Sequence, residues 1–179
     1  AMLLTINRKT HKAYNRVREQ NFSLNGLLGF NLHGKTVGVI GTGKIGKAFT
    51  RIMQGFGCKV LAYDIHPDEA LSAAGVTYLP LTDLLRQSDI ISLHCPLTPQ
   101  NHYLVNRETL SLMKPGVTIV NTSRGGLINT ADIIEALKTK QVGALCIDVY
   151  EQEEKLFFRD LSSHIIDDDL IQRLMSFPN

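Results

Sequence analysis

Residues 36–46 read TVGVIGTGKIG, and this short segment indicates the architecture of the whole chain. A β-branched run leads into the spacing Gly-x-Gly-x-x-Gly, and a helical pattern starts where the spacing ends. Gly41 permits a tight turn, Gly43 lets the backbone approach a pyrophosphate, and Gly46 lets a helix pack closely on the strand. The N–H groups at the start of such a helix favour phosphate. The spacing is weak evidence alone, but its place between a strand and a helix predicts a dinucleotide-binding turn.

An acidic residue follows the turn at the distance that such a site requires. Asp64 comes about 20 residues after the last glycine, at the end of the next short apolar run. Its carboxylate can accept hydrogen bonds from both hydroxyls of the adenosine ribose, and it would repel a 2′-phosphate. The pattern therefore favours NAD over NADP. The alternative interpretation is a glycine turn accompanied by an unrelated loop aspartate.

Strand and helix patterns alternate along the rest of the chain. The predicted strands are 36–40, 59–63, 76–79, 89–93, 117–121 and 143–148, and the predicted helices are 45–56, 67–74, 81–87, 106–113 and 130–138. We expect Thr130 to cap the last of these helices. Such alternation is typical of a parallel sheet with helices on both faces. The predicted fold class is therefore α/β, with a Rossmann-type doubly wound parallel sheet.

We expect the chain to form a single domain over residues 1–179, since this length supports one ordinary core. The predicted parts are an amphipathic leading helix over about 1–20, a loop over 21–33, the Rossmann core over about 34–150 and an irregular acidic tail over 151–179. Residues 170–175 are expected to form a last helical turn or two. The acidic run 167–169 is expected to be a solvated loop or a helix start.

The composition argues against several classes of function. A formal net charge of +2 gives no electrostatic case for binding nucleic acid or membrane. No apolar run approaches the ~18 residues that span a bilayer, and the opening segment lacks the basic start of a signal peptide. We therefore expect a cytoplasmic protein. The 3 cysteines are far apart in the sequence, so we expect neither disulfides nor a metal site.

Three predicted strands end in polar segments, which are 94–99 (HCPLTP), 121–126 (NTSRGG) and 148–153 (DVYEQE). Ligands of open parallel sheets bind at the carboxyl ends of the strands. Arg124 is followed there by two glycines, and its guanidinium could clamp a carboxylate through two parallel hydrogen bonds. The alternative for Arg124 is a structural ion pair.

Histidines are considered as proton donors, because reduction of a 2-keto acid needs one for the carbonyl oxygen. His94 lies nearest to the expected site. It either supplies the proton or lines the cofactor, and its position favours the lining role. His66 precedes a proline just after Asp64 and is expected to lie beside the adenosine.

These segments resemble the D-isomer-specific 2-hydroxyacid dehydrogenase family, and within it the D-lactate dehydrogenase branch of fermentative bacteria. The likeness covers essentially the whole chain, and its most specific stretches are 21–24, 34–46, 92–98, 121–125 and 148–151. Residues 156–158 and the acidic run 167–169 resemble the lactate branch in particular. The resemblance implies an NAD-dependent enzyme that transfers hydride reversibly between NADH and pyruvate to give D-lactate.

The resemblance also implies roles for individual residues. Arg124 matches the arginine that binds the substrate carboxylate and keto oxygen, and Glu153 matches the glutamate that hydrogen-bonds the catalytic histidine and raises its pKa. Besides the three glycines and His94, the expected cofactor contacts are Lys44, Ile45, Asp64, Cys95, Pro96, Asn101, Thr122, Ser123 and Asp148. Asp148 would lie near the nicotinamide carboxamide. Lys44 replaces the histidine or arginine of other members, a change that should not disturb pyrophosphate binding.

Two parts of the family pattern have no counterpart in the sequence. The position of the catalytic histidine lies beyond Asn179, and the two parts of the substrate domain are missing. We therefore expect this to be the cofactor domain of a longer enzyme, inactive by itself. Because subunits of the resembled family pair through their cofactor domains, we expect a homodimer.

Two alternatives to a D-lactate dehydrogenase stay open. One is another member that acts on a 2-keto or 2-hydroxy acid, of the glyoxylate, hydroxypyruvate or phosphoglycerate type. The other is a non-catalytic NAD-sensing module. The presence of both Arg124 and Glu153 favours catalysis, because a sensor needs neither.

Overall fold

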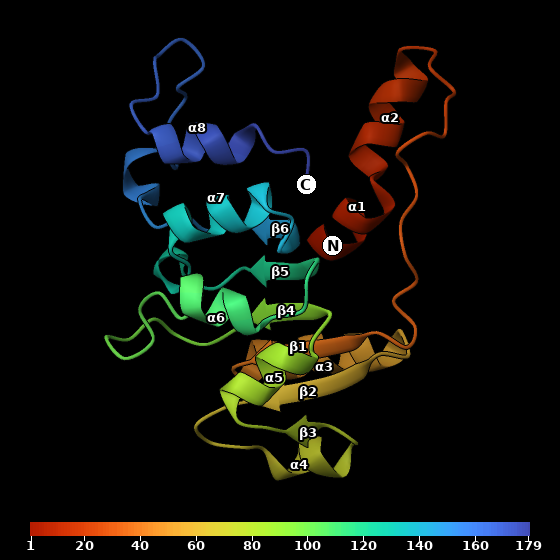
Figure 1. Cartoon of the computed structure of the whole chain (residues 1–179), viewed down its shortest axis with the longest axis vertical. Coiled ribbons are helices and arrows are strands. Elements are labelled where there is room, and N and C mark those ends of the chain that lie inside the picture. Colours follow the sequence, from red (N-terminus) through yellow and green to blue (C-terminus); the bar gives the residue numbers. More distant parts are fainter.

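The centre of the molecule is a sheet of six parallel strands (Figure 1). The computed structural model describes all 179 residues, except for the side chain of Lys155. The strands are β1 (Thr36–Ile40), β2 (Lys59–Tyr63), β3 (Thr77–Tyr78), β4 (Ile90–Leu93), β5 (Val117–Asn121) and β6 (Val142–Ile147). Their order is β3-β2-β1-β4-β5-β6, so the direction of winding reverses between β1 and β4. This order confirms the predicted doubly wound sheet.

Helices cover both faces of this sheet. They are α1 (Met2–Arg8), α2 (Thr10–Arg18), α3 (Lys44–Gly55), α4 (Glu69–Ala73), α5 (Leu81–Gln87), α6 (Arg107–Leu112), α7 (Thr130–Lys138) and α8 (Asp169–Met175), with short 3-10 turns η1 (Gly125–Leu127) and η2 (Glu153–Lys155). One buried cluster joins the strands to α5, α6 and α7, and a second joins them to α1, α3 and α4. Ile91 of β4 lies in the first cluster and Ile90 in the second, so the strand is buried on both sides.

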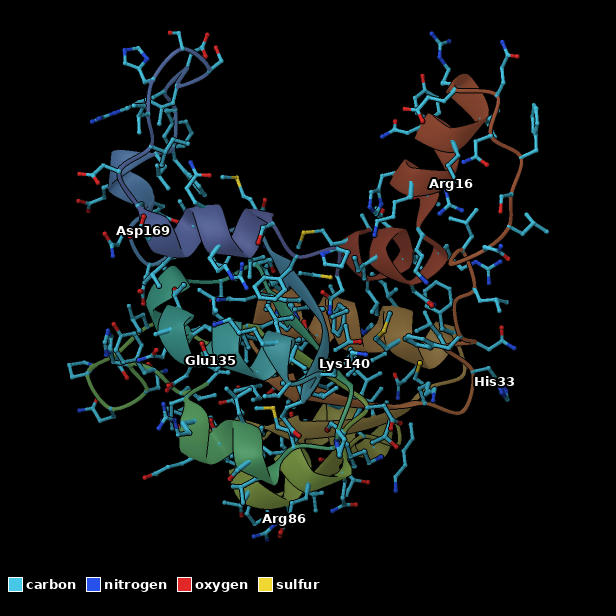
Figure 2. All side chains as sticks on the ribbon, turned by 45° about the horizontal axis from the view of Figure 1, so that its top comes forward. Arg16, His33, Arg86, Glu135, Lys140 and Asp169 are labelled. Carbon is cyan, nitrogen blue, oxygen red and sulfur yellow. The ribbon has the colours of Figure 1, made fainter. Side chains whose placement is uncertain are left out.

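The leading segment differs from the single helix expected over residues 1–20. It forms two helices, because Lys9 adopts the left-handed conformation with φ 51° and ends the hydrogen-bonding pattern of α1. Helix α2 then projects away from the sheet (Figure 1), and in Figure 2 it is the helix that carries Arg16. Several large apolar side chains of this projecting part are exposed, including Tyr14, Val17 and Leu28.

The starts of α7 and α8 are both capped by side chains, one of them by a residue other than the predicted one. The expected cap of α7 by Thr130 is wrong: the cap is Asn129, whose extended backbone lets its side-chain oxygen accept from Asp132 N at 3.0 Å. Thr130 is instead the first residue of the helix and is buried. The acidic run forms a helix start, because Asp168 accepts from the backbone N–H groups of Leu170 and Ile171.

Within the described residues, no helix has both the length and the apolar character needed to cross a membrane.

Candidate functional site

The glycine turn leaves an open side where a phosphate would fit. A Cβ atom at Gly46 would lie 2.0 Å from the carbonyl oxygen of Gly41, so this position admits only glycine. A Cβ atom at Gly43 would meet nothing within 4 Å. No side chain caps α3 among the described residues, so its first N–H groups lack the usual side-chain acceptor. The turn therefore fits the pyrophosphate of a dinucleotide.

Asp64 is tied to this turn. Its Oδ2 accepts hydrogen bonds from the N–H of Thr42 at 2.6 Å and from the hydroxyl of Thr42 at 3.0 Å, and its Oδ1 accepts from His66 N at 2.9 Å. Burial raises the pKa of Asp64, but the hydrogen bonds from His66 and Thr42 outweigh burial and bring the pKa below its usual value. The carboxylate therefore stays charged and keeps a fixed orientation beside the turn.

Thr42 and Tyr78 are functional candidates that the sequence analysis missed. The hydroxyl of Tyr78 donates to that of Thr42 at 2.9 Å, and Asp68 N donates to Tyr78 Oη at 3.0 Å. Thr42 is 3% exposed, so it supports Asp64 from inside the turn. A hydroxyl residue between the first two glycines was the available signal for Thr42. Tyr78 gave no such signal, because its contact depends on the pairing of β3 with β2.

His94 follows β4 and is mostly buried. Its ring lies 5.0 Å from the ring of Phe49, and its Nε2 is 2.9 Å from Ser92 Oγ. Burial lowers the pKa of His94 to about 4. The imidazole is therefore neutral near pH 7, which favours the lining role over proton donation. A Cβ atom at Gly41 would lie 2.7 Å from the carbonyl carbon of His94, so this residue borders the glycine turn.

The loop after β4 carries Cys95, Pro96 and Asn101. The side chain of Asn101 accepts from Thr98 N at 2.7 Å and donates to Pro96 O at 2.7 Å. Both ends of the Asn101 amide are thus engaged within their own loop, so this residue shapes the loop. The backbone oxygen of Cys95 accepts from Ser123 Oγ at 2.6 Å, which ties the loop to the end of β5.

The end of β5 presents Arg124 on a loop that Asn121 organises. Asn121 is 1% exposed, accepts from Ser123 N at 3.0 Å and donates to Arg124 O at 2.9 Å. The Arg124 side chain is exposed, and its Nη1 donates to Ser123 O at 2.8 Å. Thr122 is exposed beside it. The guanidinium is thus available at the edge of the sheet to bind an anion.

Asp148 and Glu153 follow β6, the strand next to β5. Asp148 N donates to Asn121 O at 3.0 Å, and the Asp148 side chain is exposed. Glu153 begins η2, and its Oε2 accepts from Tyr150 N at 3.1 Å. Tyr150 is anchored in turn, because its hydroxyl donates to Asp168 Oδ2 at 2.9 Å.

The expected site residues therefore gather at one edge of the sheet. β1, β4, β5 and β6 are neighbours, and their carboxyl ends carry the glycine turn, His94, Arg124 and Asp148 in turn. Lys44 and Ile45 are exposed at the start of α3, beside the open side of the turn. The described residues include no group of three His, Cys, Asp or Glu side chains suited to hold a metal ion.

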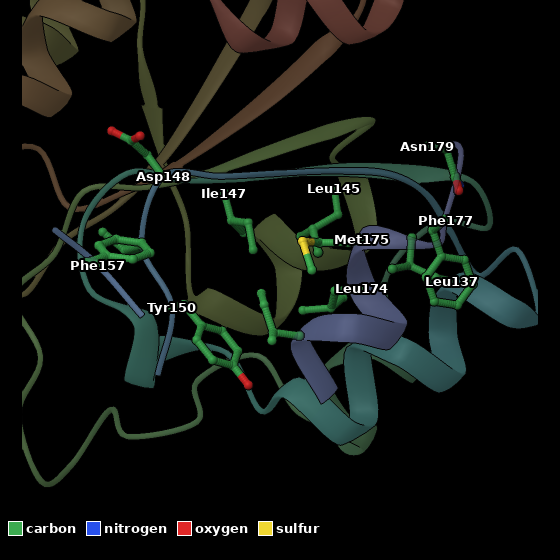
Figure 3. Close-up of a pocket in the computed structure, with 12 residues that line it drawn as sticks. Leu137, Leu145, Ile147, Asp148, Tyr150, Phe157, Leu174, Met175, Phe177 and Asn179 are labelled. Carbon is green, nitrogen blue, oxygen red and sulfur yellow. The ribbon is translucent and has the colours of Figure 1, made fainter. Parts of the chain in front are cut away.

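A separate hollow of about 440 Å³ lies between β6 and α8 (Figure 3). Its lining is mainly apolar, with Leu145, Leu174 and Phe177 among its residues. The carboxylate of Asp148 points away from it in Figure 3. The polar strand ends, and not this hollow, therefore make up the candidate site.

Comparisons with known proteins agree with this geometry. Residues 1–178 match the family model of the D-isomer specific 2-hydroxyacid dehydrogenase, NAD binding domain. A D-lactate dehydrogenase of Curvularia clavata is 56% identical over 179 residues, which is 100% of this chain and 51% of that protein. The D-lactate dehydrogenase of Escherichia coli is 53% identical over 99% of this chain and 54% of its own length.

A solved structure shows the same likeness. D-lactate dehydrogenase from Aquifex aeolicus, complexed with NAD and lactic acid, superposes with a TM-score of 0.89 at 36% identity, covering 98% of this chain and 53% of that one. The chain thus spans about half the length of the relatives that it matches.

Proposed function

The chain belongs to the D-isomer specific 2-hydroxyacid dehydrogenase family and matches its NAD-binding domain, and from this premise we propose that it is the cofactor-binding half of a D-lactate dehydrogenase. The complete enzyme would transfer hydride reversibly between NADH and pyruvate. The observation that carries this proposal is the combination of an open glycine turn, a charged Asp64 fixed beside it and an exposed Arg124 at the same edge of the sheet.

We propose that NAD binds at the carboxyl ends of the strands. NAD supplies the hydride acceptor or donor when it is bound. The N–H groups of the glycine turn, with Lys44 and Ile45, would hold its pyrophosphate, and Asp64 would hold the adenosine ribose. The remaining proposed contacts are His94, Cys95, Pro96, Thr122, Ser123 and Asp148, whereas Asn101 would act mainly by shaping its loop.

Arg124 and Glu153 are the proposed catalytic residues of this half. The guanidinium would bind the substrate carboxylate and direct the keto carbon toward the cofactor. Glu153 would hydrogen-bond a histidine from the other half of the enzyme and raise its pKa, so that the imidazolium donates a proton to the keto oxygen. His94 is not suited to that step, because its pKa is lowered to about 4.

We propose pyruvate as the substrate because both relatives named above are D-lactate dehydrogenases. Glyoxylate, hydroxypyruvate and phosphoglycerate-type acids are the competing substrates. We also propose that residues 34–150 are the Rossmann core and that 151–179 leads toward a substrate domain. We place the enzyme in the cytoplasm, where its unpaired cysteines would stay reduced.

We further propose a homodimer formed through the leading helices and the loop that follows them. Phe22, Leu24 and Leu28 are 74%, 80% and 87% exposed. An apolar surface of this kind is typical of a contact between proteins. Residues 2–18 contain no acidic side chain, whereas 151–169 are rich in Asp and Glu, so a second copy can offer opposite charge as well as apolar area.

The test is a steady-state assay of the full-length enzyme with NADH and each keto acid, followed by chiral analysis of the product. The proposal expects kcat/KM to be highest for pyruvate and the product to be D-lactate. If kcat/KM is higher for glyoxylate or hydroxypyruvate, that acid and not pyruvate is the substrate. NADH binding without turnover of any keto acid would favour the sensing module.

A further inference from the structure

The loop that carries Arg124 is packed directly on the backbone of Glu151. A Cβ atom at Gly125 would lie 2.1 Å from the carbonyl carbon of Tyr150 and 2.4 Å from the backbone nitrogen of Glu151. Only glycine allows this approach, so the contact depends on the residue that directly follows Arg124. The guanidinium and the Glu151 carboxylate therefore start from adjoining backbone positions.

Tyr103 reaches the same place from the loop after β4. Its backbone nitrogen donates to Gly126 O at 2.9 Å, and its φ of 53° is a conformation that residues other than glycine rarely adopt. Burial raises the pKa of the Tyr103 phenol, and the charge of the neighbouring Glu151 carboxylate and a hydrogen bond with it raise that pKa further. Tyr103 is thus hydrogen-bonded to the Arg124 loop and lies near the Glu151 carboxylate.

The Glu151 carboxylate has an unused acceptor. Among the described residues, its Oε2 is shielded from solvent and receives no hydrogen bond. A buried carboxylate oxygen without a donor is costly, and natural structures seldom keep one without a use. The adjoining loop offers a donor, because the Arg124 guanidinium donates through Nη1 to Ser123 O and carries further N–H groups.

We propose that Glu151 is a positioning residue for Arg124. In solution the guanidinium would divide its time between Ser123 O and Glu151 Oε2, and bound substrate would favour the second arrangement. A guanidinium has five N–H donors in one plane, so two can bind the substrate carboxylate while another edge binds Glu151 and fixes the plane. Tyr103 would hold the glutamate from its other side. This inference rests on the proposed function, which makes Arg124 the ligand of the substrate carboxylate.

The two nearby glutamates are less suited to this role. Glu153 Oε2 already accepts from Tyr150 N at 3.1 Å. Glu154 is exposed, so solvent screens its charge. Glu154 therefore provides a matched control in the same segment.

The first test compares Glu151→Gln with Glu154→Gln in the full-length enzyme. Glutamine keeps the size of the side chain and an oxygen for Tyr103 but removes the charge. We expect the KM for pyruvate to rise about tenfold in Glu151→Gln, with the Kd for NADH within about twofold of wild type. Glu154→Gln should leave both unchanged. A Glu151→Gln enzyme whose KM equals that of Glu154→Gln would overturn the proposal, as would an equal loss of NADH affinity, which indicates a merely structural role.

The second test is a double-mutant cycle with Arg124→Lys. If Glu151 acts through Arg124, Glu151→Gln should have little further effect on KM in the Arg124→Lys background, and additive effects would contradict this. Tyr103→Phe removes a single hydroxyl and should raise KM in the same direction by a smaller factor. If it does not, Tyr103 has no part in the arrangement.

An NMR measurement separates this inference from the proposed function. In full-length enzyme with ¹⁵N-labelled arginine, the Nε–Hε resonance of Arg124 should shift in Glu151→Gln and not in Glu154→Gln. A shift in an enzyme that reduces no keto acid would support the pairing while the proposed function fails. An active enzyme without the shift would disprove the pairing and leave the proposed function intact.

Discussion

At the scale of single residues, the chemistry depends on how backbone groups hold a few charged side chains. Asp64 shows this most clearly, since the N–H and hydroxyl of Thr42 and the N–H of His66 fix both of its oxygens. Position in the sequence predicted Asp64 correctly as an acid at the end of β2. It could not predict Thr42 and Tyr78 as supports, because their contacts arise only when three strands are paired.

Asp64 should control the choice of cofactor. We expect Asp64→Ala to weaken NADH binding roughly tenfold to a hundredfold, because a charge-assisted hydrogen bond is worth about 1.5–3 kcal/mol. Asp64→Asn keeps an acceptor for Thr42 but loses the charge, so it should narrow the preference for NADH over NADPH. Fluorescence titration of each variant with both cofactors measures this. Equal affinity of the unmutated chain for NADPH and NADH would show that the role given to Asp64 is wrong.

Arg124 should act on substrate and not on cofactor. Lysine keeps the positive charge but lacks the planar fork, so Arg124→Lys should lower kcat/KM for pyruvate roughly tenfold to a hundredfold in the full-length enzyme. The Kd for NADH should stay nearly constant. Arg86→Lys, at an exposed position on α5, is the control. Loss of NADH affinity with unchanged kinetics for pyruvate would show that Arg124 binds the cofactor and not the substrate.

His94 should make the fold sensitive to acid. Its pKa is about 4 in the folded state and 6.5 without burial, so between these values the unfolded chain binds a proton that the folded chain does not. Stability is therefore unaffected above about pH 6.5 and falls as the pH falls toward 4, by about 2 kcal/mol at pH 5.

Urea unfolding of wild type and His94→Gln at pH 7.5 and pH 5 measures this difference. The variant should lose about 2 kcal/mol less stability than wild type between the two conditions. His66→Gln, at an exposed position, should behave as wild type. Identical losses of stability in wild type and His94→Gln would show that protonation of His94 does not cause the acid sensitivity.

At the scale of elements, apolar runs and glycines predicted the strands and the helices of the core well. The exceptions have local causes. Lys9 interrupts the leading helix through a left-handed backbone that no sequence signal marked. Asn129 and Thr130 are both able to cap a helix, and the choice between them is made by the backbone path before α7. The contact of Asn101 with the cofactor stays a prediction, and its side chain also makes hydrogen bonds within its own loop.

The leading helices and the loop after them should hold two copies together. We expect the chain to sediment as a dimer at tens of micromolar, and Leu28→Asp to give a species near the chain mass of 19.9 kDa, because a buried charge opposes the apolar contact. Ile65→Asp, in the loop after β2, is the control, since Ile65 is also exposed and lies outside both segments of the proposed contact. A wild-type chain that sediments only as a monomer would contradict the proposed interface.

At the scale of the whole molecule, the sheet brings together residues that lie far apart in the sequence. The reversal of strand order between β1 and β4 puts the glycine turn beside His94, and the next two strands add Arg124 and Asp148. The family and the doubly wound sheet were predicted from the sequence and are confirmed. The proximity of Glu151 to Tyr103 was not foreseen, because it joins the loops that follow β4 and β6, two strands that are not direct neighbours in the sheet.

The proposal that this chain holds the cofactor but does not turn over substrate alone is tested most directly with the 179-residue chain itself. One sample is titrated with NADH by fluorescence and assayed by absorbance with NADH and pyruvate. The glycine turn and Asp64 are complete, so NADH should bind saturably. The proposed proton donor is a histidine of the other half of the enzyme, and general acid catalysis alone is worth about 100- to 10,000-fold, so pyruvate should cause no loss of NADH above background. Absence of saturable binding would contradict the assignment of the cofactor site, and pyruvate-dependent loss of NADH would show that a residue of this chain supplies the proton.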